Sequence, residues 1–342
     1  MKTVELNGEK TSGIKRIFAR SDTMVIIATL ALFVIFTVSS DGFLSAYNLF
    51  NISRTAALYI FIALGQAMAL IVGGMNLSLG QIGGLTVVIA GFCMDKMQLD
   101  PVIAVAAGIG IGLLCGFLNG IIIIKLRLSP FVATLATSFI FAGLINGISQ
   151  GYPYTGIPES FTTLGREGIG NFAYLIILAV AVLIAVWFVF RYTVVGRRLL
   201  ATGGNMEAAR LSAVNTNRML VLANMASGLF AALAGLLWIS RMGAAQPATG
   251  SDWMLISFAV AVIGGTSLSG GIINPLGIFF SSFLIVMVKN GLVMLNANVY
   301  FEQTFLGIIL LLAVSLDSIR GIVEEKRLKH MLKGREAEQQ GI

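Results

Sequence analysis

The run PVIAVAAGIGIGLLCGFLNGIIII, from Pro101 to Ile124, contains no charged side chain and decides the class of fold. A helix needs about 20 apolar residues to cross the ~30 Å hydrocarbon core of a bilayer, and this run exceeds that length. The rest of the chain has a similar composition, because 57% of its 342 residues are hydrophobic and only 11% are charged. Ordinary soluble domains carry about 25% charged residues. The sequence therefore predicts an integral membrane protein.

Further apolar segments predict an all-α polytopic membrane protein with about ten transmembrane helices, some of them broken or short. The first segment follows Lys15, Arg16 and Arg20, so a cleaved signal peptide is an alternative interpretation. We favour a retained span, because its apolar stretch is longer than that of a usual signal peptide. The predicted spans are 23–40, 55–72, 81–94, 101–124, 131–149, 173–190, 219–240, 253–264, 272–288 and 299–316.

Lys and Arg residues are distributed unevenly among the predicted loops. With the amino terminus inside, 18 of the 23 fall on the cytoplasmic side. Positively charged loops are retained in the cytoplasm. The sequence thus predicts a cytoplasmic tail (1–22), a membrane domain (23–316) and a basic cytoplasmic tail (317–342). The five basic residues expected outside are Arg54, Lys96, Arg166, Arg241 and Lys289.

The predicted spans contain no Asp, Glu, Lys, Arg or His apart from Glu302, near an outer end. Carriers that run on protons or ions usually keep ionisable groups inside the membrane, so a self-powered carrier is the less favoured alternative. The chain has no GxxxxGK[ST] phosphate loop, and no loop is long enough to fold a nucleotide-binding domain. Energy is therefore expected from another chain.

The sequence offers no catalytic or metal-binding constellation. Cys93 and Cys115 both lie in apolar runs, where a thiol usually behaves as a small hydrophobic group. The single histidine, His330, sits in the basic tail. We expect no catalytic residue, no metal and no cofactor bound by this chain.

Two glycine-containing segments repeat each other. VGGMNLSLG at 72–80 aligns with IGGTSLSGG at 263–271 and pairs Gly73 with Gly264. Both segments interrupt apolar runs beside short predicted spans, a pattern that points to a transport site where exposed backbone groups bind polar solutes. Close helix packing, ordinary turns and an inner gate remain alternatives. The residues predicted to line the solute pathway are Gly73, Gly74, Asn76, Ser78, Gly264, Gly265, Ser267 and Ser269.

The longest polar interior stretch, 191–218, predicts an ordered cytoplasmic element. Gly203 and Gly204 are expected to turn the chain, and Asn205 to cap a short helix with Glu207 in its first turn. A small helix of this kind suits docking into a groove of a soluble partner. The alternative is an amphipathic helix that lies on lipid through its arginines.

Five motifs resemble the permease subunits of ribose-type ABC sugar importers, over a region from about Asn48 to Asp317. They are GGMNLSLG, PFVATLAT at 130–137, ATGGNMEAARLSAVNTNR at 201–218, SRMGAAQPATG at 240–250 and AVIGGTSLSGG at 261–271. The resemblance implies a type II importer permease in a bacterial inner membrane. Its implied partners are a tandem ABC ATPase that uses ATP and Mg, a second permease copy or homologue, and a periplasmic binding protein.

The resemblance also assigns roles to residues of this chain. ATPase coupling falls on Gly203, Gly204, Asn205, Glu207, Ala208, Arg210 and Leu211, while Gln246 and Pro247 are expected at the rim that faces the binding protein. The family often has acidic residues where this chain has Asn76, Met254 and Ile256. The expected cargo is a small neutral solute, most simply a monosaccharide. Ribose itself is in doubt, and a furanosyl signalling molecule is an alternative.

Overall fold

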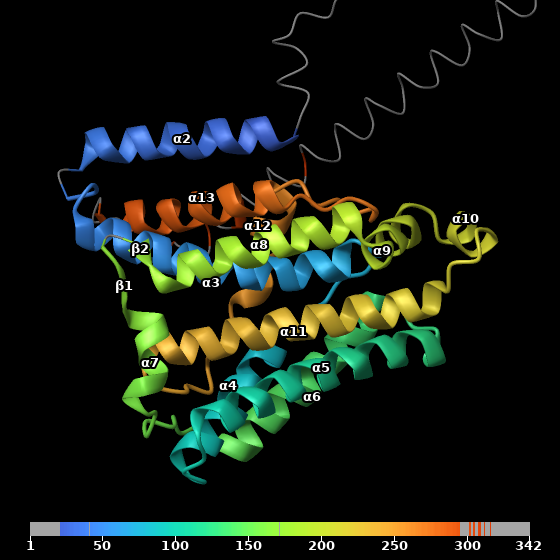
Figure 1. Ribbon diagram of the computed structural model, residues 1–342, viewed down its shortest axis with the longest axis horizontal. Coiled ribbons are helices and arrows are strands. Elements are labelled where there is room, and N and C mark those ends of the chain that lie inside the picture. Colours follow the sequence, from blue (N-terminus) through green and yellow to red (C-terminus); the bar gives the residue numbers. More distant parts are fainter. Residues whose placement is uncertain are drawn as a thin grey trace, which may run out of the picture.

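The computed structural model describes residues 21–40, 42–170 and 172–294, together with residues 301, 304, 307, 308, 311 and 315. The predicted span 299–316, including Glu302, and the two tails lie almost wholly outside these residues. The described chain is mostly helical, with one short hairpin (Figure 1). Its elements are α2 (Ser21–Ser39), α3 (Ala46–Leu70), α4 (Leu79–Asp95), α5 (Pro101–Leu126), α6 (Pro130–Ser149), α7 (Glu159–Arg166), β1 (Gly168–Ile169), β2 (Phe172–Ala173), α8 (Tyr174–Tyr192), α9 (Val194–Gly204), α10 (Met206–Leu211), α11 (Thr216–Met242), α12 (Trp253–Ile263) and α13 (Pro275–Met294).

Six of the described helices are long and apolar enough to cross a membrane, namely α3, α5, α6, α8, α11 and α13. The shorter apolar helices α2, α4 and α12 coincide with three more predicted spans. A polytopic helical membrane fold is therefore supported, while the predicted number of ten helices is not confirmed.

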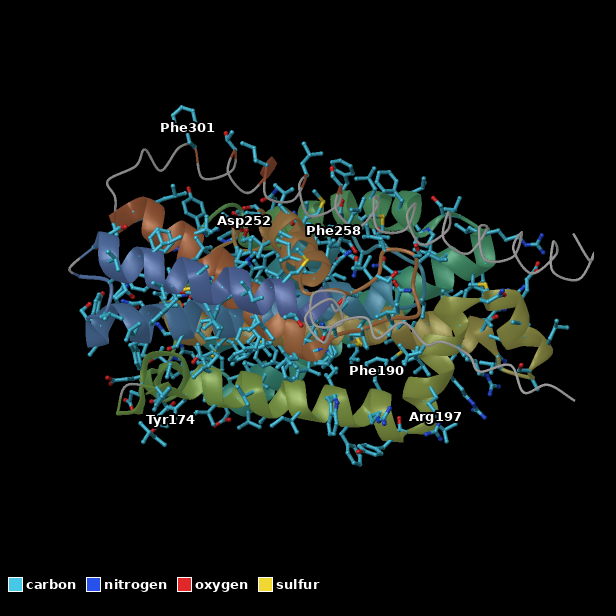
Figure 2. The ribbon with its side chains drawn as sticks, turned by 90° about the horizontal axis from the view of Figure 1, so that it is seen from above. Tyr174, Phe190, Arg197, Asp252, Phe258 and Phe301 are labelled. Atoms are coloured by element: carbon cyan, nitrogen blue, oxygen red, sulfur yellow. The ribbon has the colours of Figure 1, made fainter. Side chains whose placement is uncertain are left out.

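The helices run roughly along the long axis of the molecule. In Figure 1, α7 and the hairpin lie at one end and α9 and α10 at the other, which we call the α7 end and the α9 end. Figure 2 shows the same two ends, marked by Tyr174 and Arg197. Helix α9 and the hairpin were not predicted. The expected turn at Gly203 and Gly204 is wrong, because both residues form the last turn of α9.

Glycines set the distance between the central helices. Helix α3 is buried along most of its length, and α11 packs against α3, α4 and α5. A Cβ at Gly112 of α5 would lie 2.6 Å from the Gly228 carbonyl of α11, so these backbones touch directly. Lipid supplies no hydrophobic force between helices, and small residues at the contact allow the close packing that replaces it. Gly108 likewise lies close to side chains of α4 and α11, whereas Gly110 faces open space.

Three helices continue past the predicted spans through charged residues. Helices α3, α11 and α13 extend beyond the predicted spans and include Arg54, Arg241 and Lys289. Hydropathy ended each predicted span at its first charge, but neighbouring aromatic rings accommodate these cations within the helices. The Lys289 ammonium, for example, donates a hydrogen bond to the Tyr59 hydroxyl at 2.8 Å and lies 5.3 Å from that ring.

Candidate functional site

The two repeated segments end their helices in the same way. Gly73 follows α3 with φ +73°, and the N–H of the next residue donates to the carbonyl five positions earlier at 3.1 Å. Gly265 follows α12 with φ +84°, and the next N–H makes the equivalent bond at 3.0 Å. This is the glycine C-cap that only a residue without a Cβ adopts readily. The structure thus pairs Gly73 with Gly265, one residue later than the sequence alignment, which paired it with Gly264.

The second halves of the two segments match each other in the register of the sequence alignment. The Asn76 side-chain carbonyl accepts a hydrogen bond from the Ser78 amide at 3.1 Å, and the Ser267 hydroxyl accepts one from the Ser269 amide at 3.2 Å. Such side-chain turns satisfy backbone groups where a helix is interrupted. We call residues 71–78 the first break and residues 264–274 the second break.

The two breaks are joined to each other and to α9. The Gly271 amide donates a hydrogen bond to the Ile71 carbonyl at 2.9 Å. Gly203 of α9 lies against both, since a Cβ there would collide with the Ile71 carbonyl and lie 2.7 Å from the Gly271 nitrogen. A Cβ at Gly270 would in turn lie 2.7 Å from the Gly203 carbonyl. We call these four residues the glycine junction; it places the α9 backbone in contact with both breaks.

The predicted coupling residues lie next to this junction. The Asn205 side-chain carbonyl accepts a hydrogen bond from the Ala208 amide at 2.9 Å, so the predicted cap of α10 is confirmed. Ala209 is buried, whereas Glu207 and Leu211 are exposed, with 90% of Leu211 accessible. Ala208 and Arg210 are also exposed, and the Arg210 guanidinium donates to the Thr216 hydroxyl at 2.8 Å. Helix α10 is thus tied to α11 and presents an open outer face.

Asn76 and Ser78 belong to a buried hydrogen-bond network. The Asn76 amide donates to the Ser227 hydroxyl at 2.8 Å, and the Ser78 hydroxyl donates to the Asn76 carbonyl at 2.7 Å. The Asn119 amide donates to the Ser78 hydroxyl at 2.8 Å. All four side chains are fully buried, so in this conformation they hold the first break against α5 and α11. Their predicted contact with solute stays a prediction.

Helix α6 holds the first break from another side. The Thr134 hydroxyl accepts a hydrogen bond from the Leu77 amide at 3.0 Å and lies 3.2 Å from the Met75 carbonyl. Sequence reasoning did not select Thr134, Asn119 or Ser227 as functional residues. Their signal was present, because each is a polar residue within a long apolar run that must find a partner inside the membrane.

The segment 243–252 runs inward from the α7 end alongside α4, and we call it the re-entrant segment. A Cβ at Gly91 of α4 would collide with Ala245, and a Cβ at Gly80 would collide with the Gly250 carbonyl. These two glycines are 11 residues apart along one helix, roughly 16 Å at 1.5 Å per residue. Before α12 begins, the segment therefore follows α4 over a length that is about half of the ~30 Å hydrocarbon core.

Gln246 and Pro247 line a hollow near the α7 end. Its volume is about 430 Å³, and its lining residues are Asn146, Gly151, Pro153, Gln246, Pro247 and Ala248. Two backbone hydrogen bonds between Tyr154 and Ala245, at 3.0 and 2.8 Å, tie its two walls together. The predicted rim residues thus border a real concavity, while their contact with a binding protein stays a prediction.

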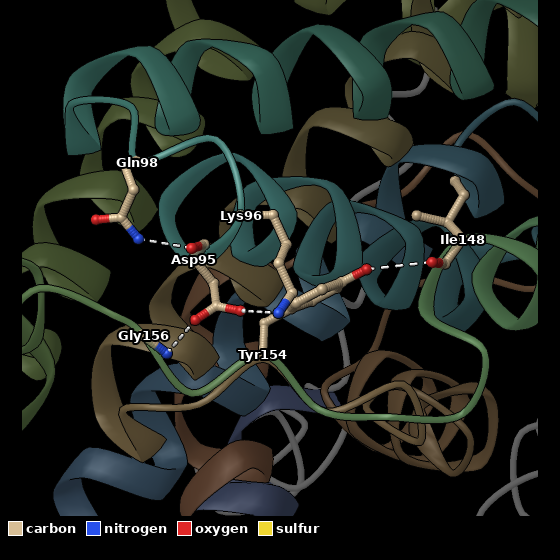
Figure 3. Close-up of polar contacts among 6 residues, drawn as sticks. All are labelled: Asp95, Lys96, Gln98, Ile148, Tyr154 and Gly156. Atoms are coloured by element: carbon tan, nitrogen blue, oxygen red, sulfur yellow. Dashed lines mark hydrogen bonds and ion pairs between the residues drawn. The ribbon is translucent and has the colours of Figure 1, made fainter.

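A polar network fixes the loop that forms one wall of the hollow (Figure 3). The Asp95 carboxylate accepts a hydrogen bond from the Gly156 amide at 2.7 Å and lies 3.5 Å from the Lys96 ammonium. The Tyr154 hydroxyl donates to the Ile148 carbonyl at 3.2 Å. Asp95 therefore ties the end of α4 to the loop after α6.

Paired helix breaks, a re-entrant segment and apolar spans define a polytopic membrane protein of the permease class. The chain belongs to the family described as branched-chain amino acid transport system / permease component, whose model matches residues 48–314.

Its relatives include sugar import permeases. It is 35% identical over 326 residues to the ribose import permease protein RbsC of Bacillus subtilis, covering 93% of this chain and 98% of that protein. It is 31% identical over 297 residues to RbsC of Escherichia coli K12, covering 86% and 92%. The galactose/methyl galactoside import permease protein MglC of Haemophilus influenzae is 32% identical over 309 residues, covering 85% and 92%. No solved structure matches significantly. The predicted resemblance to ribose-type import permeases is confirmed.

Proposed function

We propose that this chain is the transmembrane permease subunit of an ATP-driven ABC importer that moves a small neutral solute, most simply a monosaccharide. The observation that carries the proposal is the glycine junction, because it joins α9, which leads into the exposed helix α10, to both interruptions of the apolar helices. The relatives named above are import permeases for ribose and for galactose or methyl galactoside, which supports a sugar as the class of cargo.

Force enters through α10 in this proposal. A tandem ABC ATPase docks on the outer face of α10, formed by Glu207, Ala208, Arg210 and Leu211, and uses ATP and Mg. Helix α9 transmits the displacement to Gly203 and hence to both breaks. A packed junction of this kind favours two discrete arrangements over continuous bending, as a gate requires.

The solute path lies between the breaks and the re-entrant segment. The backbones of Gly80 and Gly250 touch where the first break leads into α4 and the re-entrant segment ends. We place the gate at this contact and at Ser267 and Ser269 of the second break. Asn76 and Ser78 are within the same region, and displacement of the first break would free their polar groups for weak, exchangeable contacts with solute.

The proposed docking of the ATPase on α10 also sets the orientation of the chain in the membrane. The α9 end faces the cytoplasm, so both termini are cytoplasmic and the protein resides in a bacterial inner membrane. The α7 end faces a periplasmic binding protein, with Gln246 and Pro247 at the rim. A second permease copy or homologue completes the path. A furanosyl signalling molecule is the alternative cargo.

A secondary carrier is the alternative mechanism, and one uptake experiment separates the two. Uptake of radiolabelled ribose and galactose is measured in cells that express the chain with its companion ATPase and binding protein. In one condition, a protonophore collapses the proton gradient while glycolysis maintains ATP. In the other, the proton gradient is left intact and the ATPase is replaced by a variant that cannot hydrolyse ATP. We expect uptake to survive the protonophore and to stop with the inactive ATPase; the opposite pattern would establish a secondary carrier.

A further inference from the structure

Asp252 stands at the end of the re-entrant segment, immediately before α12. Its side chain is exposed and does not cap α12. Within the part of the chain that the structure describes, its carboxylate makes no ion pair and accepts no hydrogen bond. Hydropathy had assigned this residue to an external loop.

Two independent measures place Asp252 inside the membrane. From the α7 end, the re-entrant segment follows α4 for roughly 16 Å, from Gly91 to Gly80. Gly250, two residues before Asp252, packs against Gly80. From the α9 end, α12 has 11 residues and so rises only about 16 Å from the second break. Both distances are near half of the ~30 Å hydrocarbon core.

An unpaired carboxylate at that depth needs water or a polar ligand. Translocon scales put the cost of an acidic residue at a helix centre near 3 kcal/mol. Two cations of the described helices already have contacts of their own, since Lys289 bonds Tyr59 and the Arg241 guanidinium lies over the Trp238 ring at 5.9 Å. A water-filled path, completed by the second permease of the proposed function, avoids this cost.

The surroundings of Asp252 differ from the apolar face of α8. In Figure 2, Asp252 and Phe258 lie in the half of the molecule away from Tyr174, Phe190 and Arg197 of α8 and α9. The re-entrant segment also supplies Gln246 to the hollow, together with Asn146 of α6. Neither amide side chain bonds another described residue, so the re-entrant segment carries free polar groups from Gln246, beside Asn146 of α6, to Asp252.

We propose that Asp252 is a solute-contacting residue of the permeation path and binds adjacent hydroxyl groups of a polyhydroxylated cargo. This inference rests on the proposed function and adds to it a specific recognition group. The two oxygens of a carboxylate accept two O–H donors at once, and such charge-assisted bonds are about twice as strong as neutral ones. An amide offers a single acceptor oxygen, and a cargo that lacks one of the two hydroxyls loses one bond.

Cysteine labelling tests the water exposure without knowledge of the cargo. The native Cys93 and Cys115 are buried, which keeps the background low. An Asp252→Cys variant of the full chain, in the assembled complex, is treated with a membrane-impermeant sulfonate thiol reagent. Ile184→Cys, at 59% exposed in the middle of α8, is the lipid-facing control, and Tyr152→Cys, at 74% exposed near the α7 end, is the outer-surface control.

We expect Asp252→Cys to react, at a rate that changes when the ATPase is trapped with ATP. Ile184→Cys should stay unreactive, and Tyr152→Cys should react equally in both states. An unreactive Asp252→Cys in every state would overturn the inference, as would a reaction rate that matches Tyr152→Cys and ignores the ATPase state.

The recognition role is tested with Asp252→Asn and Asp252→Glu. The probes are radiolabelled ribose and galactose, competed by their deoxy analogues that lack one hydroxyl. We expect Asp252→Asn to lower uptake about tenfold and to reduce discrimination against the deoxy analogue, while Asp252→Glu retains most of both. Normal uptake and discrimination in Asp252→Asn would refute this role while leaving ATP-dependent import intact. Loss of ATP dependence in the unmodified chain would instead refute the proposed function. If the complex takes up neither sugar, the cysteine-labelling result decides whether Asp252 lies in the permeation path.

Discussion

The amide N–H of Gly271 donates a hydrogen bond to the carbonyl oxygen of Ile71 at 2.9 Å, across about 200 residues of sequence. This bond joins the two breaks directly, and Gly203 packs against both of its ends. The carbonyl and amide groups that the interrupted helices leave free thus satisfy each other. A displacement of α9 must therefore act on both breaks together.

Adding a methyl group at Gly203 should break the connection between α9 and the membrane domain. The new Cβ would collide with the Ile71 carbonyl, so Gly203→Ala should destabilise the junction by about 1–3 kcal/mol and strongly reduce uptake. Gly204→Ala is the matched control, because no atom lies within 4 Å of a Cβ there. Uptake and the stimulation of ATP hydrolysis are measured with equal amounts of each variant in the membrane. Equal activities of the two variants would show that the glycine junction has no part in the mechanism.

Reversing charge on the outer face of α10 should uncouple the ATPase. Glu207→Arg and Arg210→Glu should abolish the stimulation of ATP hydrolysis by loaded binding protein while membrane insertion stays normal. Because Arg210 also bonds Thr216, Leu211→Asp is a cleaner probe at a side chain that is 90% exposed. Arg197→Glu on α9 tests the alternative of a helix that lies on lipid: a larger effect there than at Leu211 would favour that alternative.

Removing a hydroxyl from the buried network should destabilise the first break. Ser227→Ala leaves the Asn76 amide without its acceptor in a fully buried site, which should cost about 1–3 kcal/mol. The thermal midpoint of the detergent-solubilised protein should fall by several degrees. Ser138→Ala is the control, since that hydroxyl is exposed and bonds only its own helix. A similar midpoint for both variants would contradict a structural role for the network.

The descent of the re-entrant segment along α4 should depend on Gly80. Gly80→Ala places a methyl group on the Gly250 carbonyl and should force the two backbones apart, with loss of uptake and a lower thermal midpoint. Gly110→Ala in α5 faces open space and should be neutral or slightly stabilising, because alanine favours a helix by about 1 kcal/mol over glycine. A neutral Gly80→Ala would show that the segment does not pack as described.

Blocking the second break should stop uptake. Ser269 is exposed within a segment where three glycines have positive φ, so Ser269→Trp adds bulk without burying a polar group. We expect normal membrane insertion and no uptake. Full uptake by this variant would mean that the second break serves packing alone.

The sequence predicted the apolar helices well, because a run of uncharged residues long enough to span a bilayer has few other solutions. It failed at helix ends, where Arg54 and Lys289 continue their helices beside aromatic rings. Helix α9 was missed because Gly203 and Gly204 are typical of a turn, yet here glycine is needed for contact with two other backbones.

The candidate site was only partly accessible from sequence. The sequence repeat predicted two interrupted helices. The one-residue shift that pairs Gly73 with Gly265, instead of with Gly264, depends on backbone φ angles that cannot be read from the sequence. The depth of Asp252 was invisible, because a re-entrant segment rich in small and polar residues resembles an external loop. The spacing of Gly80, Gly84 and Gly91 on one face of α4 was the available signal for a backbone packed against that helix.

Reconstitution of the purified chain by itself in lipid vesicles tests whether transport by this chain depends on a separate ATPase. Ribose and galactose accumulation is measured under imposed proton and sodium gradients, and again after addition of the ATPase, ATP and loaded binding protein. We expect no accumulation by the chain alone and ATP-dependent accumulation by the complex. Accumulation against a concentration gradient by the isolated chain would contradict this expectation.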